Sequence, residues 1–575
     1  MKRLLPYLKG YTKESILGPL FKLFEATLEL LVPLVVAAII DNGIVGGLGN
    51  SYVIKAALIL VALGAVGLFF SVTAQYFAAK ASVGFATRLR HALFAHVGKL
   101  SYSDIDTLGT STLITRMTAD VNQVQSGMNL ALRLLLRSPF VVFGAMVMAF
   151  TVDAKSAVTF AVTIPILSVV VFGIMLISIP LYKKVQQRLD GVVRSTRENI
   201  GGVRVIRAFC REEEETKTFR ERTDSLSKMQ KFVGRITGLM NPLTYIIINV
   251  AVIVLIRVGA LRVEMGDLSQ GEVIALYNYM AQILVELIKL ASLIISITKA
   301  LASAGRVADV LDTKPSMANG TQPYTARESG EILAFDKVSL RYAGAGDDSL
   351  SSLSFAVNKG ETVGIIGGTG AGKTSLVSLI PRFYDATEGR VTLWGRDIKE
   401  YDTESLREKI AIVPQKAVLF SGTIRDNMKW GNKNATDEEI MSAVKTAQAF
   451  SVVEEKGGLD ATIEAGGRNF SGGQRQRLTI ARALVKKPDI LILDDSASAL
   501  DFATDAALRA AIREYAKDTT VFIVSQRASS ILYADKILVL DDGEVVGAGR
   551  HEELLATCAL YKEIYDTQFT SGGEA

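Results

Sequence analysis

Cysteine is almost missing from this chain of 575 residues. The two cysteines, Cys210 and Cys558, cannot build a disulfide framework, so the fold does not depend on covalent cross-links. Long tracts of lysine or arginine are missing as well, and the formal net charge is only +5. This modest positive charge argues against nucleic acid as a partner and fits the loops of a membrane protein better.

Apolar residues, by contrast, make up 49% of the chain and give a mean hydropathy of +0.29, although 21% of the residues are charged. A chain of this length is too long for one ordinary core, so we expect at least two domains. High hydropathy together with abundant charge indicates that one part is immersed in lipid and another in water.

Six apolar segments are long enough, at about 20 residues, to cross the ~30 Å hydrocarbon core of a membrane as helices. They lie at residues 16–40, 56–79, 130–152, 157–182, 236–260 and 271–297. The links after the second and fourth segments are long and basic, whereas residues 41–52 contain no lysine or arginine. This charge bias predicts that the long links and both termini are cytoplasmic, and that each long link forms an extended helical hairpin.

Polar residues recur at helical spacing on one face of the first span and on one face of the last. They are Lys22, Glu25 and Glu29 in the first span, and Asn278, Gln282, Glu286 and Lys289 in the last. Ionisable groups are costly in lipid, so these faces should line a bundle interior or a wet cavity. Lys22 can also reach the interface and pair with Glu25. Glu29 and Glu286 are therefore the candidates for a translocation path, whose acidity would suit cationic amphiphiles.

The composition changes after the last span. Residues 303–312 continue its helix, and residues 313–330 are a linker rich in Pro, Gly and Thr. Over residues 331–570, short β-branched runs alternate with amphipathic stretches, which predicts an α/β domain with buried strands. The predicted fold is therefore an all-α, six-helix transmembrane domain at residues 1–312, with long helical hairpins, followed by a linker and an α/β domain.

A glycine-rich segment of the second domain matches the P-loop pattern in full. Its residues are Gly367, Gly368, Thr369, Gly370, Ala371, Gly372, Lys373 and Thr374, and Ser375 stands near the start of the following helix. An apolar strand at residues 362–366 precedes the segment, which favours a nucleotide-binding loop over a chance glycine-rich turn. Lys373 is expected to reach the β- and γ-phosphates of ATP, and Thr374 to bind Mg²⁺.

A buried strand at residues 490–493 ends in Asp494, a further candidate ligand for Mg²⁺. Before it stands a four-residue string, made of Ser471, Gly472, Gly473 and Gln474. This string resembles the signature motif of the ATP-binding cassette (ABC) family, and the whole chain resembles an ABC exporter half-transporter. Ser471 can act as a helix N-cap, as a receptor for a γ-phosphate, or as both. In the family this receptor faces the nucleotide held by another subunit.

Further residues match family motifs in order along the chain. Tyr342 resembles the aromatic residue that stacks on adenine, although a tyrosine taken alone fits a core or surface position better. Gln415 resembles the glutamine that touches Mg²⁺ and senses the membrane domain. Residues 108–121 and 197–209 resemble the family's coupling segments, short helices at hairpin tips that dock on cassettes, and plain helical packing is the alternative.

Two positions depart from the family pattern. Asp495 stands where most exporters have a glutamate that polarises the attacking water, and Gln526 stands where they have a histidine near the γ-phosphate. Asp495 is one methylene shorter, and Gln526 cannot carry positive charge. These changes are either tolerable drift or the mark of a degenerate site. With a degenerate site, the chain resembles one subunit of heterodimeric bacterial multidrug exporters. The resemblance implies a partner half that carries the consensus catalytic site, which Ser471 of this chain completes in trans.

The resemblance implies an ABC-type transport ATPase that uses ATP and Mg²⁺, with residues 331–570 as its cassette. We expect a multi-pass subunit of the bacterial cytoplasmic membrane, with the cassette in the cytoplasm, that exports hydrophobic or amphipathic small molecules as part of a heterodimer. Lipid flipping, peptide export, a slow homodimer, and a nucleotide-gated channel or sensor are the alternatives.

Overall fold

The computed structural model describes residues 2–515 and 517–570. The chain divides into two compact units. The first unit is the chain up to Gly98 together with Ser111–Thr313, and the second is Lys99–Thr110 together with the chain from Lys314 onward. The second unit therefore includes a short piece of the first long hairpin.

The first unit is helical. Its elements are the short 3₁₀ helix η1 (Lys2–Leu8), the π-helices η2 (Ile39–Val45) and η3 (Arg116–Asp120), and the helices α1 (Thr12–Ala38), α2 (Gly49–Val97), α4 (Thr110–Thr115), α5 (Val121–Leu134), α6 (Arg137–Val152), α7 (Ala154–Gly201), α8 (Val203–Ala208), α9 (Glu212–Gly238), α10 (Met240–Glu264) and α11 (Gln270–Asp312). Within the described residues, six continuous helical stretches are long and apolar enough to cross a membrane, and each predicted span lies within one of them. The prediction of six spans is confirmed.

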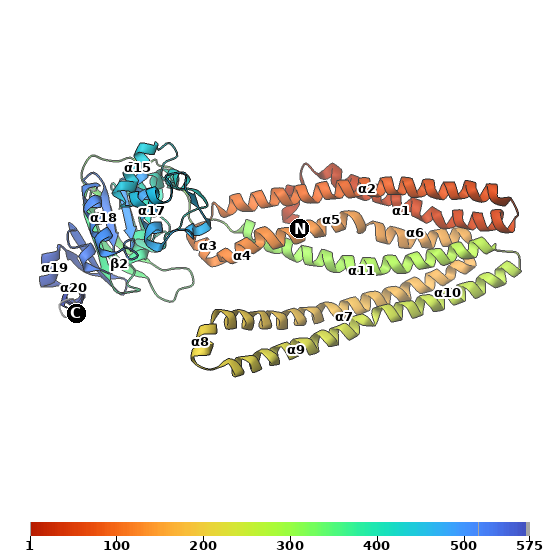
Figure 1. Cartoon of the computed structure of the whole chain (residues 1–575). Coiled ribbons are helices and arrows are strands. Elements are labelled where there is room, and N and C mark those ends of the chain that lie inside the picture. Colours follow the sequence, from red (N-terminus) through yellow and green to blue (C-terminus); the bar gives the residue numbers. More distant parts are fainter. Residues whose placement is uncertain (1, 516, 571–575) are drawn as a thin grey trace. The chain divides into compact units, whose positions relative to one another are not determined.

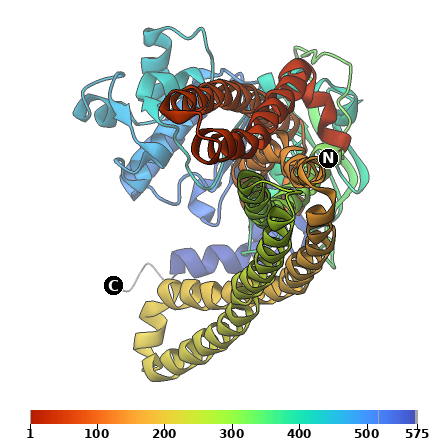
Figure 2. The same cartoon turned by 90° about the vertical axis from the view of Figure 1, so that its right-hand side faces the viewer.

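The helices of the first unit are much longer than a bilayer is thick. Helix α7 has 48 residues, which at 1.5 Å per residue is about 70 Å, more than twice the hydrocarbon thickness. It packs lengthwise against α9 and α10, while α11 packs against α1, α5 and α6 (Figures 1 and 2). The long links are therefore helical hairpins, as the helical periodicity of the sequence predicts.

The second unit is an α/β domain to which α3 (Tyr102–Leu108) belongs. Its strands are β1 (Glu331–Leu340), β2 (Leu350–Asn358), β3 (Thr362–Gly367), β4 (Glu388–Leu393), β5 (Arg396–Asp397), β6 (Ile410–Val413), β7 (Gly422–Thr423), β8 (Thr462–Ile463), β9 (Ile490–Asp494), β10 (Thr520–Val524), β11 (Lys536–Asp541) and β12 (Glu544–Gly549). Its other helices are α12 (Lys373–Leu379), α13 (Thr403–Glu408), α14 (Ile424–Lys429), α15 (Asp437–Thr446), α16 (Phe450–Glu455), α17 (Gly472–Val485), α18 (Phe502–Tyr515), α19 (His551–Thr557) and α20 (Ala559–Thr570), with short 3₁₀ turns η4 (Ile398–Glu400), η5 (Ala465–Gly467) and η6 (Ala528–Ser530).

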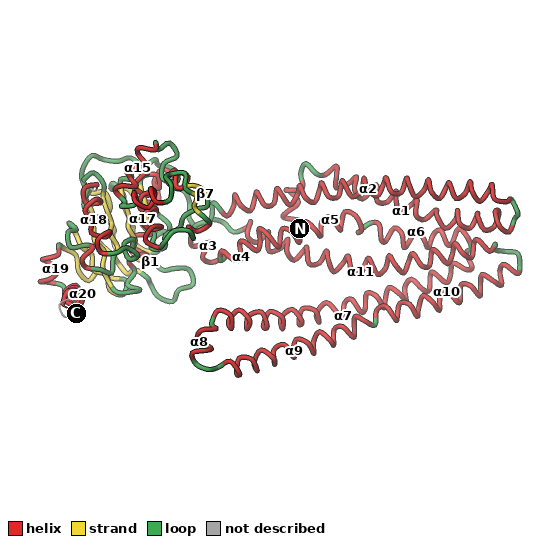
Figure 3. The backbone as a smooth tube through the Cα atoms, viewed as in Figure 1, coloured by secondary structure: helices red, strands yellow, loops and turns green. Residues whose placement is uncertain are grey.

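The main sheet of this unit has the strand order β12-β11-β3-β10-β9-β6 and is covered by helices (Figure 3). Strands β3, β9 and β10 are buried along their whole length and pair in parallel, which explains why their sequences are continuous apolar runs. In an open parallel sheet, ligands bind at the carboxyl ends of the strands. The P-loop after β3 and the carboxylate at the end of β9 therefore lie at one edge.

The short helix of the first long hairpin lies earlier than the resemblance suggests. Helix α3 ends at Leu108, which is the first residue of the predicted coupling segment 108–121. That segment instead forms α4 and η3. In the second long hairpin, the short helix α8 falls inside the quoted segment 197–209. The position of α3 follows from a capping box, in which Ser101 and Asp104 bond each other's backbone N–H groups.

Candidate nucleotide-binding site

The P-loop connects the buried strand β3 to α12, and its helix begins at Lys373, two residues before Ser375. Gly372 has φ +90°, and a Cβ on it would lie 2.7 Å from the carbonyl oxygen of Ser349. Only glycine fits this position without a shift of the backbone. The loop borders a cavity of about 510 Å³. Its lining includes Thr369, Gly370, Ala371, Gly372, Lys373, Thr374, Ser375, Gln415, Asp494, Asp495 and Gln526.

Lys373 is buried beneath the loop, where its Nζ donates to the carbonyl oxygens of Gly367 at 2.9 Å and Gly368 at 2.5 Å. Burial lowers the pKa of Lys373, and the nearby carboxylates Asp494 and Asp495 act in the opposite direction. Phosphate oxygens are stronger acceptors for an ammonium than neutral carbonyls are. The lysine is therefore placed to exchange these carbonyl bonds for phosphate bonds.

Oxygen donors gather beside the lysine at the strand edge. Thr374 Oγ1 donates to Asp494 Oδ1 at 3.2 Å, and Gln415 Nε2 donates to Asp495 Oδ2 at 3.3 Å. Burial raises the pKa of both carboxyls, and for Asp494 the neighbouring Asp495 charge adds to the effect. Two adjacent carboxylates that are disfavoured in their charged form suit a divalent cation. Hydroxyl, carboxylate and amide oxygens are the donors that Mg²⁺ prefers, so these residues fit it.

Asp495 and Gln526 both line the cavity but are held in different ways. Asp495 adopts a left-handed backbone with φ 45°, and its N–H donates to the carbonyl oxygen of Val524. The exposed Gln526 follows β10, and its carbonyl oxygen accepts a 2.8 Å bond from Gln568 of α20. The structure thus brings the two altered positions to the same cavity as the P-loop.

The four residues from Ser471 to Gln474 begin α17 and are absent from the described lining of this cavity. Ser471 Oγ accepts the N–H of Gln474 at 3.2 Å, and Gln474 Oε1 accepts the N–H of Ser471 at 2.9 Å. This capping box occupies acceptor sites of the exposed Ser471 but leaves its hydroxyl hydrogen free to donate. The N-cap prediction is confirmed, and the helix start remains a candidate receptor for an anion.

Tyr342 stands next to the P-loop helix. Its hydroxyl bonds Ser375 Oγ at 3.0 Å, and its half-buried ring meets the ring of Tyr384 edge-on at 5.0 Å. Tyr342 belongs to the same side of the site as the N-terminus of α12. This position is compatible with an adenine platform, because one ring face is not used by the edge-on contact.

The polar faces of the first and last spans also meet, through a residue that sequence reasoning missed. Arg137 of α6 bonds Glu29 of α1 and, at 2.7 Å, Glu286 of α11, and Lys289 also bonds Glu286 at 2.9 Å. These residues are called the polar cluster below. Lys22 pairs with Glu25, as the sequence suggests. The available signal was Arg137 itself, a cation within the third apolar segment, together with the carboxylates Glu29 and Glu286 in two other spans.

A groove of about 520 Å³ between α1 and α11 borders the polar cluster. Its lining includes Glu29, Asn278, Gln282, Glu286 and Lys289, with valines between them. Two carboxylates and two cations balance in the cluster, so Arg137 offsets the acidity that the first and last spans show on their own. The groove is polar but close to neutral, and charge gives no reason to favour cationic amphiphiles.

A helical membrane unit joined to a P-loop α/β unit with a signature-type helix defines an ATP-driven transport protein. The family described as ABC transporter transmembrane region matches residues 15–287, and the family described as ABC transporter matches residues 350–498. The chain is 35% identical over 575 residues to the ABC transporter ATP-binding protein YfiB of Bacillus subtilis, covering 100% of this chain and 99% of that protein. This chain therefore belongs to the ABC transporter family.

Two further likenesses agree with this assignment. The ATP-dependent lipid A-core flippase of Desulfotalea psychrophila is 34% identical over 477 residues, 83% of each protein. A bacterial Atm1-family ABC exporter with ATP bound has the same fold, with a TM-score of 0.79 at 24% identity, over 97% of this chain and 98% of that one. The chain is thus a multi-pass half-transporter of the exporter type with an ATPase domain. Transporters of this type act with a partner half or as homodimers.

Proposed function

We propose that this chain is one half of a heterodimeric ABC exporter, in which its own site binds ATP tightly and hydrolyses it slowly. The observation that carries the proposal is the pair Asp495 and Gln526, which both face the nucleotide cavity where a longer acid and a histidine are expected. One carboxylate oxygen of Asp495 moreover already accepts a hydrogen bond from Gln415 at 3.3 Å. A general base acts only within hydrogen-bond reach of the water, so the shorter side chain slows the step.

In this arrangement the chain contributes residues to two nucleotide sites, its own and that of its partner. At its own site, the P-loop N–H groups and Lys373 would bind the triphosphate. Thr374, Asp494 and Gln415 would hold Mg²⁺, which would supply positive charge to offset that of the phosphates. At the partner's site, Ser471 and the start of α17 donate to the γ-phosphate. The chain thereby serves hydrolysis mainly in trans, at a cassette that carries the consensus catalytic residues.

The transported substrate is proposed to be a hydrophobic or amphipathic small molecule. The groove beside the polar cluster supports this, because valines alternate with amide and charged groups along its walls. Among the described residues, the buried atoms Gln282 Oε1 and Glu286 Oε2 lack a hydrogen-bond partner. Polar groups beside the groove are therefore free to bond a substrate. We place the transporter in a bacterial cytoplasmic membrane with its cassette in the cytoplasm, because the long links are basic.

Lipid flipping is the second candidate for transport, and the likeness to a protein named as a lipid A-core flippase favours it. Reconstitution in vesicles separates the two functions. Movement of a fluorescent lipid between leaflets without ATP-dependent accumulation of amphipathic dyes supports flipping, and the reverse supports small-molecule export.

The heterodimer is tested by Asp495→Glu in a complex whose partner carries an inactivated catalytic carboxylate, so that only this chain's site can turn over. Hydrolysis should rise roughly tenfold or more, since a positioned base is worth 10²–10⁴-fold. Asp541→Glu, which adds the same methylene to an exposed aspartate at the end of β11, is the matched control. Unchanged hydrolysis, or a chain that purifies alone as a homodimer with robust ATPase activity, would sink the proposal.

A further inference from the structure

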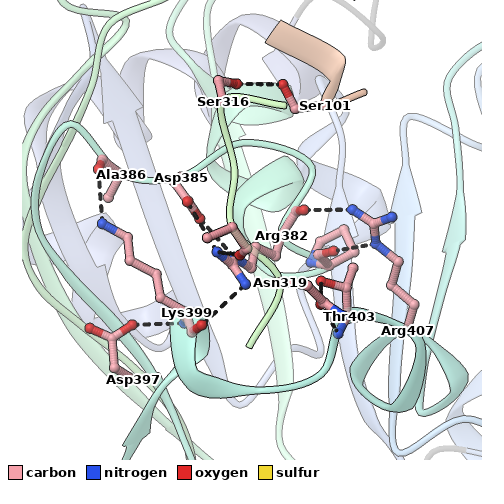
Figure 4. A network of polar contacts seen from close by, with 12 residues as sticks. Ser101, Ser316, Asn319, Arg382, Asp385, Ala386, Asp397, Lys399, Thr403 and Arg407 are labelled. Carbon is pink, nitrogen blue, oxygen red and sulfur yellow. Dashed lines mark hydrogen bonds and ion pairs between the residues drawn. The ribbon is translucent and has the colours of Figure 1, made fainter. Parts of the chain in front are cut away.

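The segment that follows the P-loop helix is held by several polar contacts of Arg382. Arg382 is 2% exposed and has φ 51°, and its guanidinium donates to Asp385, to the carbonyl of Lys399 at 3.2 Å and to that of Ala318 at 2.8 Å (Figure 4). A buried arginine with several acceptors fixes the backbone around it. Because Ala318 lies in the linker, the linker is fastened to the exit of α12.

The same linker is bonded to α3 of the first long hairpin. Ser316 N donates to Asp104 Oδ2 at 3.0 Å, and the hydroxyls of Ser316 and Ser101 are 2.7 Å apart (Figure 4). Asn319 bonds Asp402 and Thr403, which continue the anchor into the cassette. Helix α3, the linker and the exit of α12 thus form one connected polar network within the second unit.

Tyr384 joins this network directly to α3. Its hydroxyl donates to Asp106 Oδ2 at 2.7 Å, and the ring of its neighbour Phe383 lies 4.6 Å from that of Tyr102. Burial, reinforced by the Asp106 carboxylate, raises the pKa of Tyr384, so the phenol stays protonated and donates at any working pH. A neutral donor facing a carboxylate makes a charge-assisted hydrogen bond.

The ring of Tyr384 also contacts Tyr342, which is bonded to the P-loop helix. The two rings meet edge-on at 5.0 Å, with an angle of 89° between the ring planes, and Tyr342 in turn bonds Ser375 of α12. Interiors are packed closely enough that a shift of one ring displaces its neighbour. Tyr384 therefore contacts Tyr342 through its ring and α3 through its hydroxyl.

We propose that Tyr384 is a positioning residue that transmits occupancy of the adenine side of the nucleotide site to α3. The inference rests on the proposed function, since it assumes that ATP binds beside Tyr342. When a base stacks on Tyr342, the Tyr342 ring is restrained and presses on the ring of Tyr384. The Tyr384–Asp106 hydrogen bond then restrains α3 in the first long hairpin. A nucleotide with a smaller base occupies the P-loop through its phosphates but does not restrain α3.

Hydrogen exchange on the intact transporter tests this without depending on which site hydrolyses. In the wild type, Mg-ATP should protect the amides of both α12 and α3, whereas Mg-UTP should protect α12 but α3 much less. Tyr384→Phe and Asp106→Asn should each lower the ATP-dependent protection of α3 by about fivefold, the scale of one exposed charge-assisted bond, with α12 unchanged. The double variant should match the single variants, because both remove the same bond.

Tyr401→Phe is the matched control, since the Tyr401 hydroxyl also makes a single bond, to the carbonyl of Leu393 at 2.8 Å. Additive effects of Tyr384→Phe and Asp106→Asn, or equal α3 protection by ATP and UTP, overturn the inference. So does a Tyr384→Phe variant that behaves like Tyr401→Phe. Failure of ATP to protect α12 at all would instead overturn ATP binding, and with it the proposed function.

Discussion

Replacing Arg137 with methionine tests whether the polar cluster holds α1, α6 and α11 together. The Arg137 side chain is 8% exposed and that of Glu286 is 4% exposed, with 2.7 Å between Nη1 and Oε1. Methionine keeps much of the length and removes the charge. Glu286 would retain Lys289, whose side chain is 49% exposed, while Glu29 would lose Arg137.

The expected loss follows from the burial of these charges. Removing one partner of a buried ion pair costs about 3–5 kcal/mol when the remaining charge is left without compensation. Because Glu286 keeps Lys289 and the Glu29 side chain is 40% exposed, Arg137→Met should cost an amount at or below the lower end of this range. Neutralising Glu286 as well should return part of that loss, so Arg137→Met with Glu286→Gln should be more stable than the sum of the single losses predicts. A coupling of roughly 0.5–3 kcal/mol is normal for groups in direct contact.

The assay is the free energy of unfolding of the full chain in bicelles, followed by a probe in the helical unit. Arg133→Met is the control, because Arg133 lies one turn earlier on α5 and is only half-buried. Equal losses for the two methionine variants, or strict additivity with Glu286→Gln, would refute the reasoning. The cluster would then be a set of solvated charges and not a buried network.

Three other substitutions test separate parts of the structure. Because burial and the Asp495 charge raise the pKa of Asp494, the folded state binds more protons than the unfolded state, and stability falls as pH rises through the raised pKa. Asp494→Asn should therefore raise the melting temperature of the nucleotide-free protein at pH 7, flatten its pH dependence and abolish the stabilisation by Mg-ATP. Asp41 accepts the N–H of Gly271 at 2.7 Å and the hydroxyl of Ser269, so Asp41→Ala should cost about 1–2 kcal/mol in chemical unfolding, and Asp41→Asn less. Arg382→Lys keeps the charge but loses the planar fork, and should destabilise the cassette by about 1.5–3 kcal/mol in the same assay, with Arg390→Lys, an exposed pair, as the neutral comparison.

The parts that sequence predicts best are those fixed by burial and by glycine chemistry. Strand β9 was predicted at 490–493 with Asp494 at its end, and β3 at 362–366, within one residue of the structure. Both strands are buried on two faces, so their sequences are uninterrupted apolar runs that permit little else. The six spans were equally clear, because only long apolar helices satisfy their backbone in lipid. Helix ends in the hairpins were less clear, since no membrane boundary marks them.

The parts that sequence could not supply depend on contacts between distant segments. Arg137 was visible as a cation, but its pairing with Glu29 and Glu286 needs three helices in one place. Likewise, nothing in the local sequence of Asp106 indicates a tyrosine 278 residues away as its donor. Charge stripes on single helices gave the correct faces but not the charge balance, because Arg137 comes from a third helix.

The backbone at Asp495 sharpens the interpretation of the altered catalytic position. A non-glycine residue with φ 45° occupies the left-handed region, where aspartate is enriched because its short polar side chain can bond locally. Glutamate is not favoured in this region. Compared with glutamate, Asp495 therefore lowers the backbone strain at this position and also shortens the reach of the carboxylate toward the attacking water. A strained backbone conformation persists only where the surrounding structure holds it in place. Asp495→Glu should therefore move two measurements in opposite directions, raising hydrolysis while lowering cassette stability by up to about 1 kcal/mol. A variant that gained in both, compared with Asp541→Glu by thermal unfolding and ATPase assay, would show that reach and strain are not linked at this site.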